Sequence, residues 1–256
     1  MGVWLQRLIL LFAVGWPNLL AAEVVNVGAY EFPPFYTDYH RETSLLTKKL
    51  VRLFNSRQTR YHFHIVPTTP ERRYADFKAG KFDVMFFESR QWGWKDHPVE
   101  ASRVFLSGGE RYVALKNPHA GRTQKFFDDL SRVRIAGIEG YHYGFADFKA
   151  EKDWLQSKYR ITLVTNPHQL MGLILNKKAD IAVVTMSWLE TYLQQNPAMR
   201  QKLLISKKLD QVYSHTILVR KGFKPGVAWM NQVLLKLKKS GALRKIFPPG
   251  LQNSLI

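Results

Sequence analysis

Three short stretches of the chain combine side chains that could bind a small molecule. In GAYEFPPFY, residues 28–36, four aromatic rings and two adjacent prolines directly follow an apolar alternating run. A loop that only had to turn would use small polar residues. Pro33 and Pro34 would restrict the backbone that carries these rings, so a ring that belonged to a binding site would not have to be ordered when a ligand binds. The alternative is that the rings belong to the core, and we favour it for Phe35.

The stretch ESRQWGWKD, residues 88–96, supplies the charges of a possible anion site. The guanidinium of Arg90 can form a bidentate pair with a carboxylate or a phosphate, whereas Lys95 acts more as a point charge. Hydrogen bonds to charged groups contribute about 1.5–3 kcal/mol each, so one such clamp can set the class of ligand. Arg90 could equally be a solvated surface charge. Trp92 and Trp94 either form a wall of the site or pack the loop.

The third stretch, EGYHYG at residues 139–144, lies between a predicted strand and a predicted helix. Such a turn directs backbone N–H groups at the start of a helix toward a ligand, which suits an anion. His142 in this turn faces either a cleft or water. Two more cations, Arg72 and Arg73, lie near the start of another predicted helix; Arg73 could face a cleft, but we expect both to be solvent-exposed.

An alternation of strands and helices must position these stretches. Apolar runs typical of strands and amphipathic runs typical of helices follow one another along the chain, with proline and glycine at their ends. The predicted strands are 24–29, 61–67, 82–87, 133–138, 160–165, 179–184 and 213–222, with two more β-rich pieces within 102–117 around Gly108 and Gly109. The predicted helices are 42–56, 70–80, 143–158, 167–178, 186–196 and 226–247, the last with an internal glycine break. This order predicts an α/β fold with mostly parallel sheets flanked by helices.

The series of strands and helices occurs twice, which predicts two lobes. We expect residues 23–110 together with 214–256 to form lobe 1, and residues 111–213 to form lobe 2. Two hinge crossings, near 108–116 and 208–216, would join them. Ligands of open parallel sheets bind outside the carboxyl ends of the strands, so the predicted site is the cleft between the lobes.

The composition narrows the class of protein. With 46% hydrophobic and 23% charged residues, the chain of 256 residues is typical of a globular protein. The net charge of +18 could indicate a nucleic-acid partner, but the basic residues are scattered, and we expect attraction to anionic lipid, cell wall or an acidic ligand instead. The absence of cysteine excludes disulfides, thiol nucleophiles and thiolate metal sites. We expect no nucleic-acid partner, no metal and no cofactor.

The first 22 residues have the pattern of a secretory signal peptide. Arg7 precedes the apolar run LILLFAVGW, and Pro17 and the pair Ala21-Ala22 follow. That run is shorter than the roughly 20 residues of a transmembrane span. We therefore expect cleavage before Glu23 and a mature protein in the periplasm, whose net charge would be +17 because the leader carries one arginine and no acid.

In order and spacing, the segments resemble the bacterial extracellular solute-binding proteins of family 3, the polar-amino-acid type of periplasmic binding protein. The resemblance rests on VGAYEFPPF (27–35), FKAGKFDVMFF (77–87), IAGIEGYHYG (135–144), LILNKKADIAVV (173–184) and LLKLKKSGALRKIF (234–247). It covers nearly all of the chain after residue 22. It implies a two-lobe, type II periplasmic binding protein fold. It also implies a monomer that captures a small polar solute and delivers it to the membrane permease of an ABC transporter.

The resemblance also assigns roles in the first lobe. Phe32 stands at the place of the aromatic residue that covers the ligand, with Tyr30 close by. Lys95 takes the place of the arginine that binds the α-carboxylate in the amino-acid binders of the family, and Arg90 stands among their serine and threonine positions.

In the second lobe, His142 and Tyr143 match positions that hydrogen-bond the ligand. Thr185 replaces the acid that pairs with the α-amine, and this puts recognition of an ordinary amino acid in doubt unless Glu88 supplies the missing charge. The ligand could instead be an unusual amino acid, a peptide-like compound or an organic acid.

Two other functions fit a fold of this kind. One is an exported dehydratase-like enzyme that would use Glu88, Glu139 and His142 as acid and base. The other is a free binding protein that feeds a sensory receptor. The sequence contains no nucleophile elbow, phosphate loop or metal pair, so we expect binding without catalysis.

Overall fold

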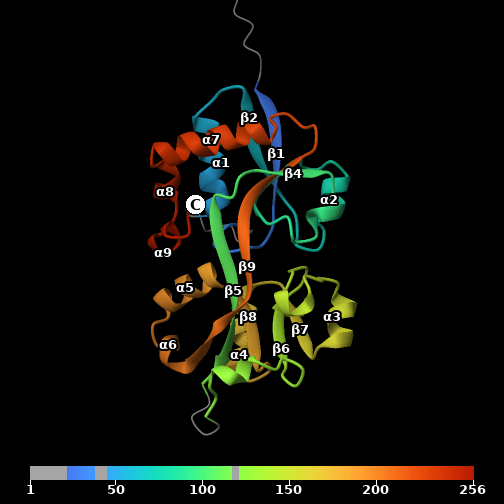
Figure 1. The fold of residues 1–256 in the computed structure, drawn as a ribbon, viewed down its shortest axis with the longest axis vertical. Helices are drawn as coiled ribbons and strands as arrows, with labels where there is room; N and C mark the ends of the chain where they lie inside the picture. Colours follow the sequence, from blue (N-terminus) through green and yellow to red (C-terminus); the bar gives the residue numbers. More distant parts are fainter. Residues whose placement is uncertain (1–21, 38–44, 117–120) are drawn as a thin grey trace, which may run out of the picture.

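The computed structural model describes residues 22–37, 45–116 and 121–256 and arranges them in two lobes (Figure 1). The predicted leader lies outside the described residues except for Ala22. Among the residues that are described, no helix is both long and apolar enough to cross a membrane. The predicted α/β fold with two lobes is confirmed.

The first lobe, at the top of Figure 1, is built on a sheet in which β1 lies between β2 and β3, both parallel to it. The last part of β9 runs antiparallel to β3 and to β4. The strands are β1 (Glu23–Ala29), β2 (Tyr61–Pro67), β3 (Val84–Glu88), β4 (Val99–Ala101) and β9 (Leu203–Arg220). The helices are α1 (Leu46–Ser56), α2 (Arg73–Lys78), α7 (Val227–Lys239), α8 (Ala242–Ile246) and α9 (Pro249–Gln252), with the 3₁₀ turn η1 (Trp94–Asp96).

The second lobe repeats the arrangement, with β6 between the parallel strands β7 and β8. β5 runs antiparallel to β8 on one side and to β9 on the other. The strands are β5 (Leu106–Leu115), β6 (Ile135–Ile138), β7 (Ile161–Val164) and β8 (Ile181–Thr185). The helices are α3 (Lys152–Lys158), α4 (Pro167–Leu175), α5 (Met186–Gln195) and α6 (Met199–Lys202), with the 3₁₀ turns η2 (Gln124–Phe127) and η3 (Gly144–Ala146).

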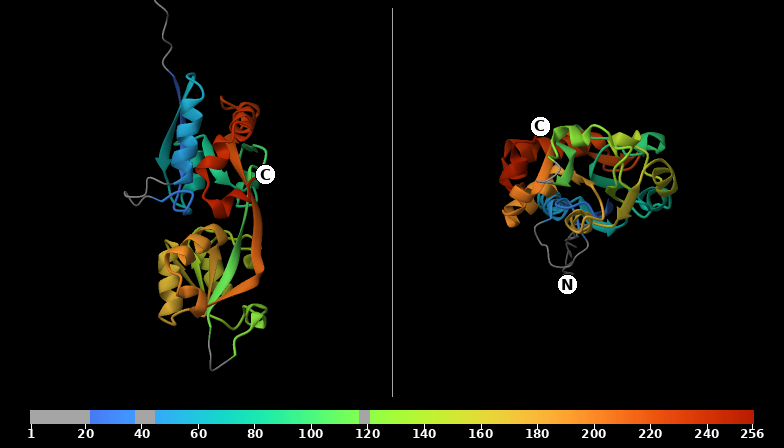
Figure 2. Two further views of the ribbon diagram at one scale, coloured as in Figure 1. Left: turned by 90° about the vertical axis from the view of Figure 1, so that its left-hand side faces the viewer. Right: turned by 90° about the horizontal axis from the view of Figure 1, so that it is seen from below.

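β5 and β9 connect the lobes. They pair from Leu106 and His215 at one end to Leu115 and Leu203 at the other. Figures 1 and 2 show the two strands running side by side from the upper lobe into the lower one. The lobe boundaries proposed from the sequence fall within these strands. Each strand pairs with strands of both lobes, so the pairing does not fix where one lobe ends, and the boundaries after residues 110 and 213 stay predictions.

The apolar residues of the sequence form the core that holds each lobe together. In lobe 1, Leu50 and Phe54 of α1 are buried, and the Phe54 ring lies 5.3 Å from that of Phe63 in β2. Trp229 of α7 stacks on Phe63 with 5.9 Å between ring centroids. A helix from late in the chain therefore packs on the first lobe. The predicted break in this region is confirmed at Gly241, which has φ of 70°, a conformation that favours glycine.

One predicted helix, residues 143–158, is wrong. The chain forms the short turn η3 first and begins α3 only at Lys152. Asp147 and Phe148 have φ of 51° and 60°, in the left-handed region, which interrupts a helix. Asp210 of β9 accepts hydrogen bonds from the backbone N–H groups of Gly144 and Phe145. A contact from a distant strand therefore decides the local structure here.

Candidate functional site

The two lobes meet along a crevice that has a packed half and a hollow half. The packed half is lined by Tyr30, Phe32, Arg73, Trp92, Glu110, Gly140, Tyr141, His142 and Gln211. The loops after β1 and β3 and the start of α2 bring residues of lobe 1 to this place, the turn after β6 brings Gly140, Tyr141 and His142, and β5 and β9 contribute Glu110 and Gln211. The loops and the turn lie at the carboxyl ends of parallel strands, where open sheets bind their ligands.

A buried ion pair lies at the packed half. Arg73 is 1% exposed and Glu88 is fully buried, and Arg73 Nε lies 3.8 Å from Glu88 Oε1. The guanidinium carbon lies 5.0 Å from the ring centre of Tyr30 and 4.4 Å from that of Tyr74. Burial raises the pKa of Glu88 above its ordinary value, and the charge of Arg73 opposes that rise. Removing one partner of such a pair leaves a buried charge without compensation.

Arg73 also reaches across the crevice. Its Nη1 donates to the carbonyl oxygen of Gly140 in lobe 2, at 3.1 Å, and to that of Pro70 in its own lobe. Its Nη2 donates to the Tyr74 hydroxyl at 2.6 Å. The same hydroxyl lies 2.7 Å from His142 Nε2. One cluster of polar groups therefore ties α2 to the turn after β6.

Further hydrogen bonds join the lobes beside this cluster. Trp92 Nε1 donates to Gln211 Oε1 of β9 at 3.0 Å, and Gln211 Nε2 donates to Glu110 Oε2 of β5 at 2.8 Å. The Tyr141 hydroxyl donates to the carbonyl oxygen of Glu31 at 2.8 Å. Burial and the nearby Asp210 raise the pKa of Glu110 to about 8. Burial and Arg73 lower the pKa of His142 to about 4. At neutral pH, His142 is therefore neutral and Glu110 is mainly protonated.

The packed half leaves a cavity of only about 10 Å³. A buried water needs a volume of about this size. A solute as large as an amino acid would not fit there unless the side chains moved or the lobes separated. In the arrangement that the structure shows, the packed half is a contact between the lobes.

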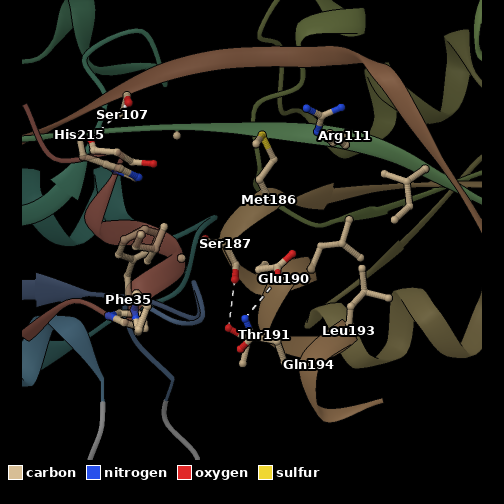
Figure 3. A pocket seen from close by; sticks show the side chains of 18 of the residues that line it. Phe35, Ser107, Arg111, Met186, Ser187, Glu190, Thr191, Leu193, Gln194 and His215 are labelled. Carbon is tan, nitrogen blue, oxygen red and sulfur yellow. Dashed lines mark hydrogen bonds between the residues drawn. The ribbon is translucent and has the colours of Figure 1, made fainter. Parts of the chain in front are cut away.

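The hollow half encloses about 460 Å³ between α5 and the opposite lobe (Figure 3). This volume falls within the range typical of small-molecule sites, about 300–1,000 Å³. Phe35 and the segment from Pro248 to Leu251 form the lobe 1 wall, α5 forms the lobe 2 wall, and β5 and β9 form the back. The lining residues are Phe35, Ser107, Gly108, Arg111, Met186, Ser187, Leu189, Glu190, Thr191, Leu193, Gln194, Arg200, Ile205, Tyr213, His215, Pro248, Pro249, Gly250, Leu251 and Ser254.

His215 of β9 lies at the lobe 1 side of the hollow half, with its ring 4.6 Å from that of Phe35 and 4.9 Å from that of Tyr213. It is fully buried, and this burial lowers its pKa to about 3. Its Nδ1 lies 2.9 Å from the carbonyl oxygen of Phe87. Among the residues that the structure describes, His215 Nε2 and Ser187 Oγ are buried atoms that have no hydrogen-bond partner.

The sequence-predicted site residues fall into three groups. Tyr30, Phe32 and His142 line the packed half, and Glu88 is the counterion of Arg73 beside it. Tyr143 and Thr185 are buried next to the crevice: the Tyr143 hydroxyl hydrogen-bonds the backbone of Ile138, and Thr185 pairs with Glu110 in the sheet. Arg90 and Lys95 are exposed and line neither half.

The structure corrects one expectation and adds residues that the sequence did not reveal. Arg72 is exposed as expected, but Arg73 is buried in the crevice. Arg73 lies four positions before Phe77, so it shares the buried face of α2, and this spacing was the available signal. Glu110 and Gln211 are also part of the packed half, and no local pattern distinguished them. Phe35, assigned to the core, is 2% exposed and also lines the hollow half.

Known proteins resemble this chain in structure but not detectably in sequence. No family model matches the chain, and no curated protein matches it in sequence. A mutant of ArgBP from T. maritima superposes with a TM-score of 0.68 at 20% identity, covering 87% of this chain and 93% of that one. The GluR0 ligand-binding core from Nostoc punctiforme, in complex with L-glutamate, gives 0.65 at 16% identity, with 87% and 96% covered. The fold is that of the two-lobe type II periplasmic binding proteins.

A third structure of this fold is relevant to the choice between binding and catalysis. The ancestral amino-acid-binding protein AncCDT-1, a precursor of cyclohexadienyl dehydratase, superposes with a TM-score of 0.62 at 17% identity, covering 87% of this chain and 93% of that one. Identities this low show a shared fold, and the function has to be argued from the site itself.

Proposed function

We propose that the protein is a solute-binding protein and that its solute occupies the hollow half of the crevice. One observation carries this proposal: a cavity of about 460 Å³ lies between the lobes and is lined by both of them and by the two connecting strands. A molecule that touches both walls favours the arrangement in which the lobes are close together, and this is how hinged binding proteins respond to their ligands.

The comparisons support a solute related to amino acids. L-glutamate is bound in the GluR0 core, and AncCDT-1 is described as an amino-acid-binding protein. We further propose that the protein acts in the periplasm as a monomer and delivers its solute to the permease of an ABC transporter. A binding protein that feeds a receptor would use the same crevice.

In this proposal the residues of the packed half join the lobes. Tyr30, Phe32, Glu88 and His142 would influence solute binding through closure, because they lie in or beside contacts that cross the crevice. The proposal assigns no role to Arg90, Lys95, Tyr143 or Thr185. The enzymatic alternative would require a substrate to reach Glu88 and His142, and the cavity of about 10 Å³ beside them speaks against it.

The test is a thermal-shift screen of the purified protein against amino acids, small peptides and organic acids, followed by titration of each hit. Ser187→Trp places an indole in the hollow half and should abolish binding of the hit. Ser157→Trp is the matched control, because Ser157 is an exposed serine on α3 of the same lobe; it should bind like the wild type. A hit that binds to Ser187→Trp with unchanged affinity but is lost in Phe32→Ala would place the solute in the packed half and refute the proposal.

A further inference from the structure

One side of lobe 1 is covered by helices that carry positive charge only. Residues 45–70 contain five lysines and arginines and no acid, and residues 211–256 contain eight and no acid. These two segments supply α1, α7 and α8, and α8 packs against both other helices on one side of the upper lobe (Figures 1 and 2). Lys49 Nζ of α1 lies 3.5 Å from the carbonyl oxygen of Ile246 in α8. We call the cations on the three helices the basic face: Lys48, Lys49, Arg52, Lys236, Lys238, Lys239, Arg244 and Lys245.

The charges of the basic face form no ion pair within the described part of the chain. The two lysines on α1 are half-buried, and the other six side chains are exposed. Lobe 2 differs, because acids lie among its cations: Lys152 and Arg200 are exposed and each lies 3.2 Å from a glutamate, Glu139 and Glu190. Positive charges that gather without acids repel one another, so an anionic partner would stabilise the basic face.

The composition of the basic face suits an extended anionic surface. Six of its eight residues are lysines, whose ammonium groups are hydrated point charges, whereas bidentate recognition of a single carboxylate or phosphate favours arginine. None of the eight lines either half of the crevice. Clusters of about four to eight basic residues on a helical surface are typical of proteins that bind anionic lipids.

An exposed apolar residue lies among these charges. Leu235 of α7 is 46% exposed. Residues three and four positions apart share one face of a helix, so Leu235 lies on the face of Lys238 and Lys239. An apolar side chain in this position can enter the boundary between lipid headgroups and acyl chains while the ammonium groups stay with the phosphates. Leu235 therefore favours a membrane over a purely acidic protein surface.

We infer that the basic face of lobe 1 binds the surface of an anionic phospholipid membrane. The inference is independent of the solute and of its place in the crevice. Attachment through α1, α7 and α8 involves lobe 1 alone, and β5 and β9 connect this lobe to lobe 2. Lobe 2 could therefore move about the connecting strands while lobe 1 stays on the membrane. A protein held in this way would present its crevice next to the bilayer, where the proposed permease would lie.

Co-sedimentation with lipid vesicles tests this inference. The protein is used from Glu23 onward, because the apolar run of the predicted leader could itself bind lipid and every described helix and strand lies after residue 22. Vesicles of equal parts phosphatidylglycerol and phosphatidylcholine should bind the protein at low salt and release it as salt is added, whereas phosphatidylcholine alone should not bind it. Lys236→Gln/Lys238→Gln/Lys239→Gln should weaken binding about a hundredfold, since each basic residue near an anionic surface contributes a factor of about five.

A matched control separates the basic face from the net charge of the protein. Lys158→Gln/Lys178→Gln/Lys202→Gln removes three exposed lysines from lobe 2 and lowers the net charge by the same amount. We expect this control to keep most of the vesicle binding of the wild type. Both triple variants change exposed side chains only, so urea denaturation should show that they are folded.

A second pair of variants tests whether Leu235 enters the membrane. Leu235→Ser should weaken vesicle binding about tenfold, because burial of a leucine side chain contributes at least that factor. Leu175→Ser is the control, since Leu175 is an exposed leucine of lobe 2, and it should bind like the wild type.

Three results would overturn the inference. If the two triple variants lose vesicle binding equally, the attraction comes from the net charge and not from the basic face. If phosphatidylglycerol does not increase binding, the membrane is not the partner. If poly-L-glutamate binds the wild type but not the triple variant of α7, while Leu235→Ser leaves vesicle binding unchanged, the basic face recognises an acidic protein instead of a membrane.

Discussion

The buried pair of Arg73 and Glu88 allows the sharpest test of how the crevice is held together. Arg73→Met keeps an unbranched apolar stem but removes the guanidinium. Glu88, which is fully buried, then loses its counterion, and the carbonyl oxygen of Gly140 loses a hydrogen bond from the other lobe. Removing one partner of a buried ion pair costs about 3–5 kcal/mol. We expect a loss of that size in the free energy of unfolding, measured by urea denaturation at pH 7.5.

The loss of unfolding free energy in Arg73→Met should depend on pH, and the environment of Glu88 determines the direction of this dependence. The pKa of Glu88 is raised by burial and lowered by the charge of Arg73, so it should rise further in Arg73→Met. When the folded pKa of an acid exceeds its unfolded value, stability falls as the pH rises from the unfolded value through the folded one. Arg73→Met should therefore lose least near pH 4, where Glu88 is protonated, and progressively more as the pH rises and the buried carboxyl group becomes charged.

Arg72→Met is the matched control. Arg72 is the N-cap residue directly before α2, its side chain is 66% exposed, and its Nη2 lies 3.7 Å from Asp76 Oδ1. A pair with one exposed partner contributes about 0–1 kcal/mol, and Asp76 keeps Lys81 at 2.7 Å in this variant. The double variant Arg73→Met/Glu88→Gln should recover most of the stability, because glutamine carries no charge and keeps an acceptor for Trp94 Nε1. Equal losses in Arg72→Met and Arg73→Met, or no recovery in the double variant, would refute this account of the pair.

Three further predictions concern the same crevice. The pKa of Glu110 is raised to about 8 from an ordinary value of 4.5, so Glu110 makes the free energy of unfolding fall as the pH rises between these values. Glu110→Gln should flatten this dependence in urea denaturation, and an unchanged slope would contradict the raised pKa of Glu110. At Gly140, where φ is 75°, a Cβ would lie 2.7 Å from the backbone nitrogen of Glu71 in the other lobe. Gly140→Ala should therefore push the lobes apart and raise the radius of gyration measured by small-angle scattering. Gly172→Ala is the control and should not change it, because open space surrounds Gly172. Asp210→Ala removes the acceptor for two N–H groups of η3 and for the Tyr112 hydroxyl, and should cost about 1–3 kcal/mol in urea denaturation, a value that Asp128→Ala at an exposed position should not approach.

Much of the fold could be predicted from the spacing of apolar residues and from the proline and glycine residues at the ends of segments. The buried runs at β3 and β8 and the amphipathic pattern of α1 depend on residues that are close in the sequence, and the structure confirms them. The helix predicted over residues 143–158 shows where this reasoning fails. Where it should start, the chain forms η3, whose backbone N–H groups at Gly144 and Phe145 donate to Asp210, more than sixty residues away in the sequence.

The site, like the fold, was predictable where it depends on local sequence and not where it depends on contacts between distant segments. Loops that leave parallel strands at their carboxyl ends converge whatever their exact sequences, so the sequence could bring Tyr30, Glu88 and His142 to one region. The spacing of Arg73 to Phe77 could indicate that Arg73 faces inward, but not that it fills this region, because its position there depends on partners from three other segments, Tyr30, Glu88 and Gly140. Nor could it find the hollow half, which lies between α5 and the last residues of the chain.

The sequence by itself determined the class of fold, the order of the elements and the loops that face the crevice, because each depends on local patterns of apolar residues, proline and glycine. Only the tertiary structure decided which half of the crevice is filled and which is open. Whether a volume between two lobes is occupied depends on side chains that meet from distant parts of the chain, and their meeting is a property of packing that no local pattern contains.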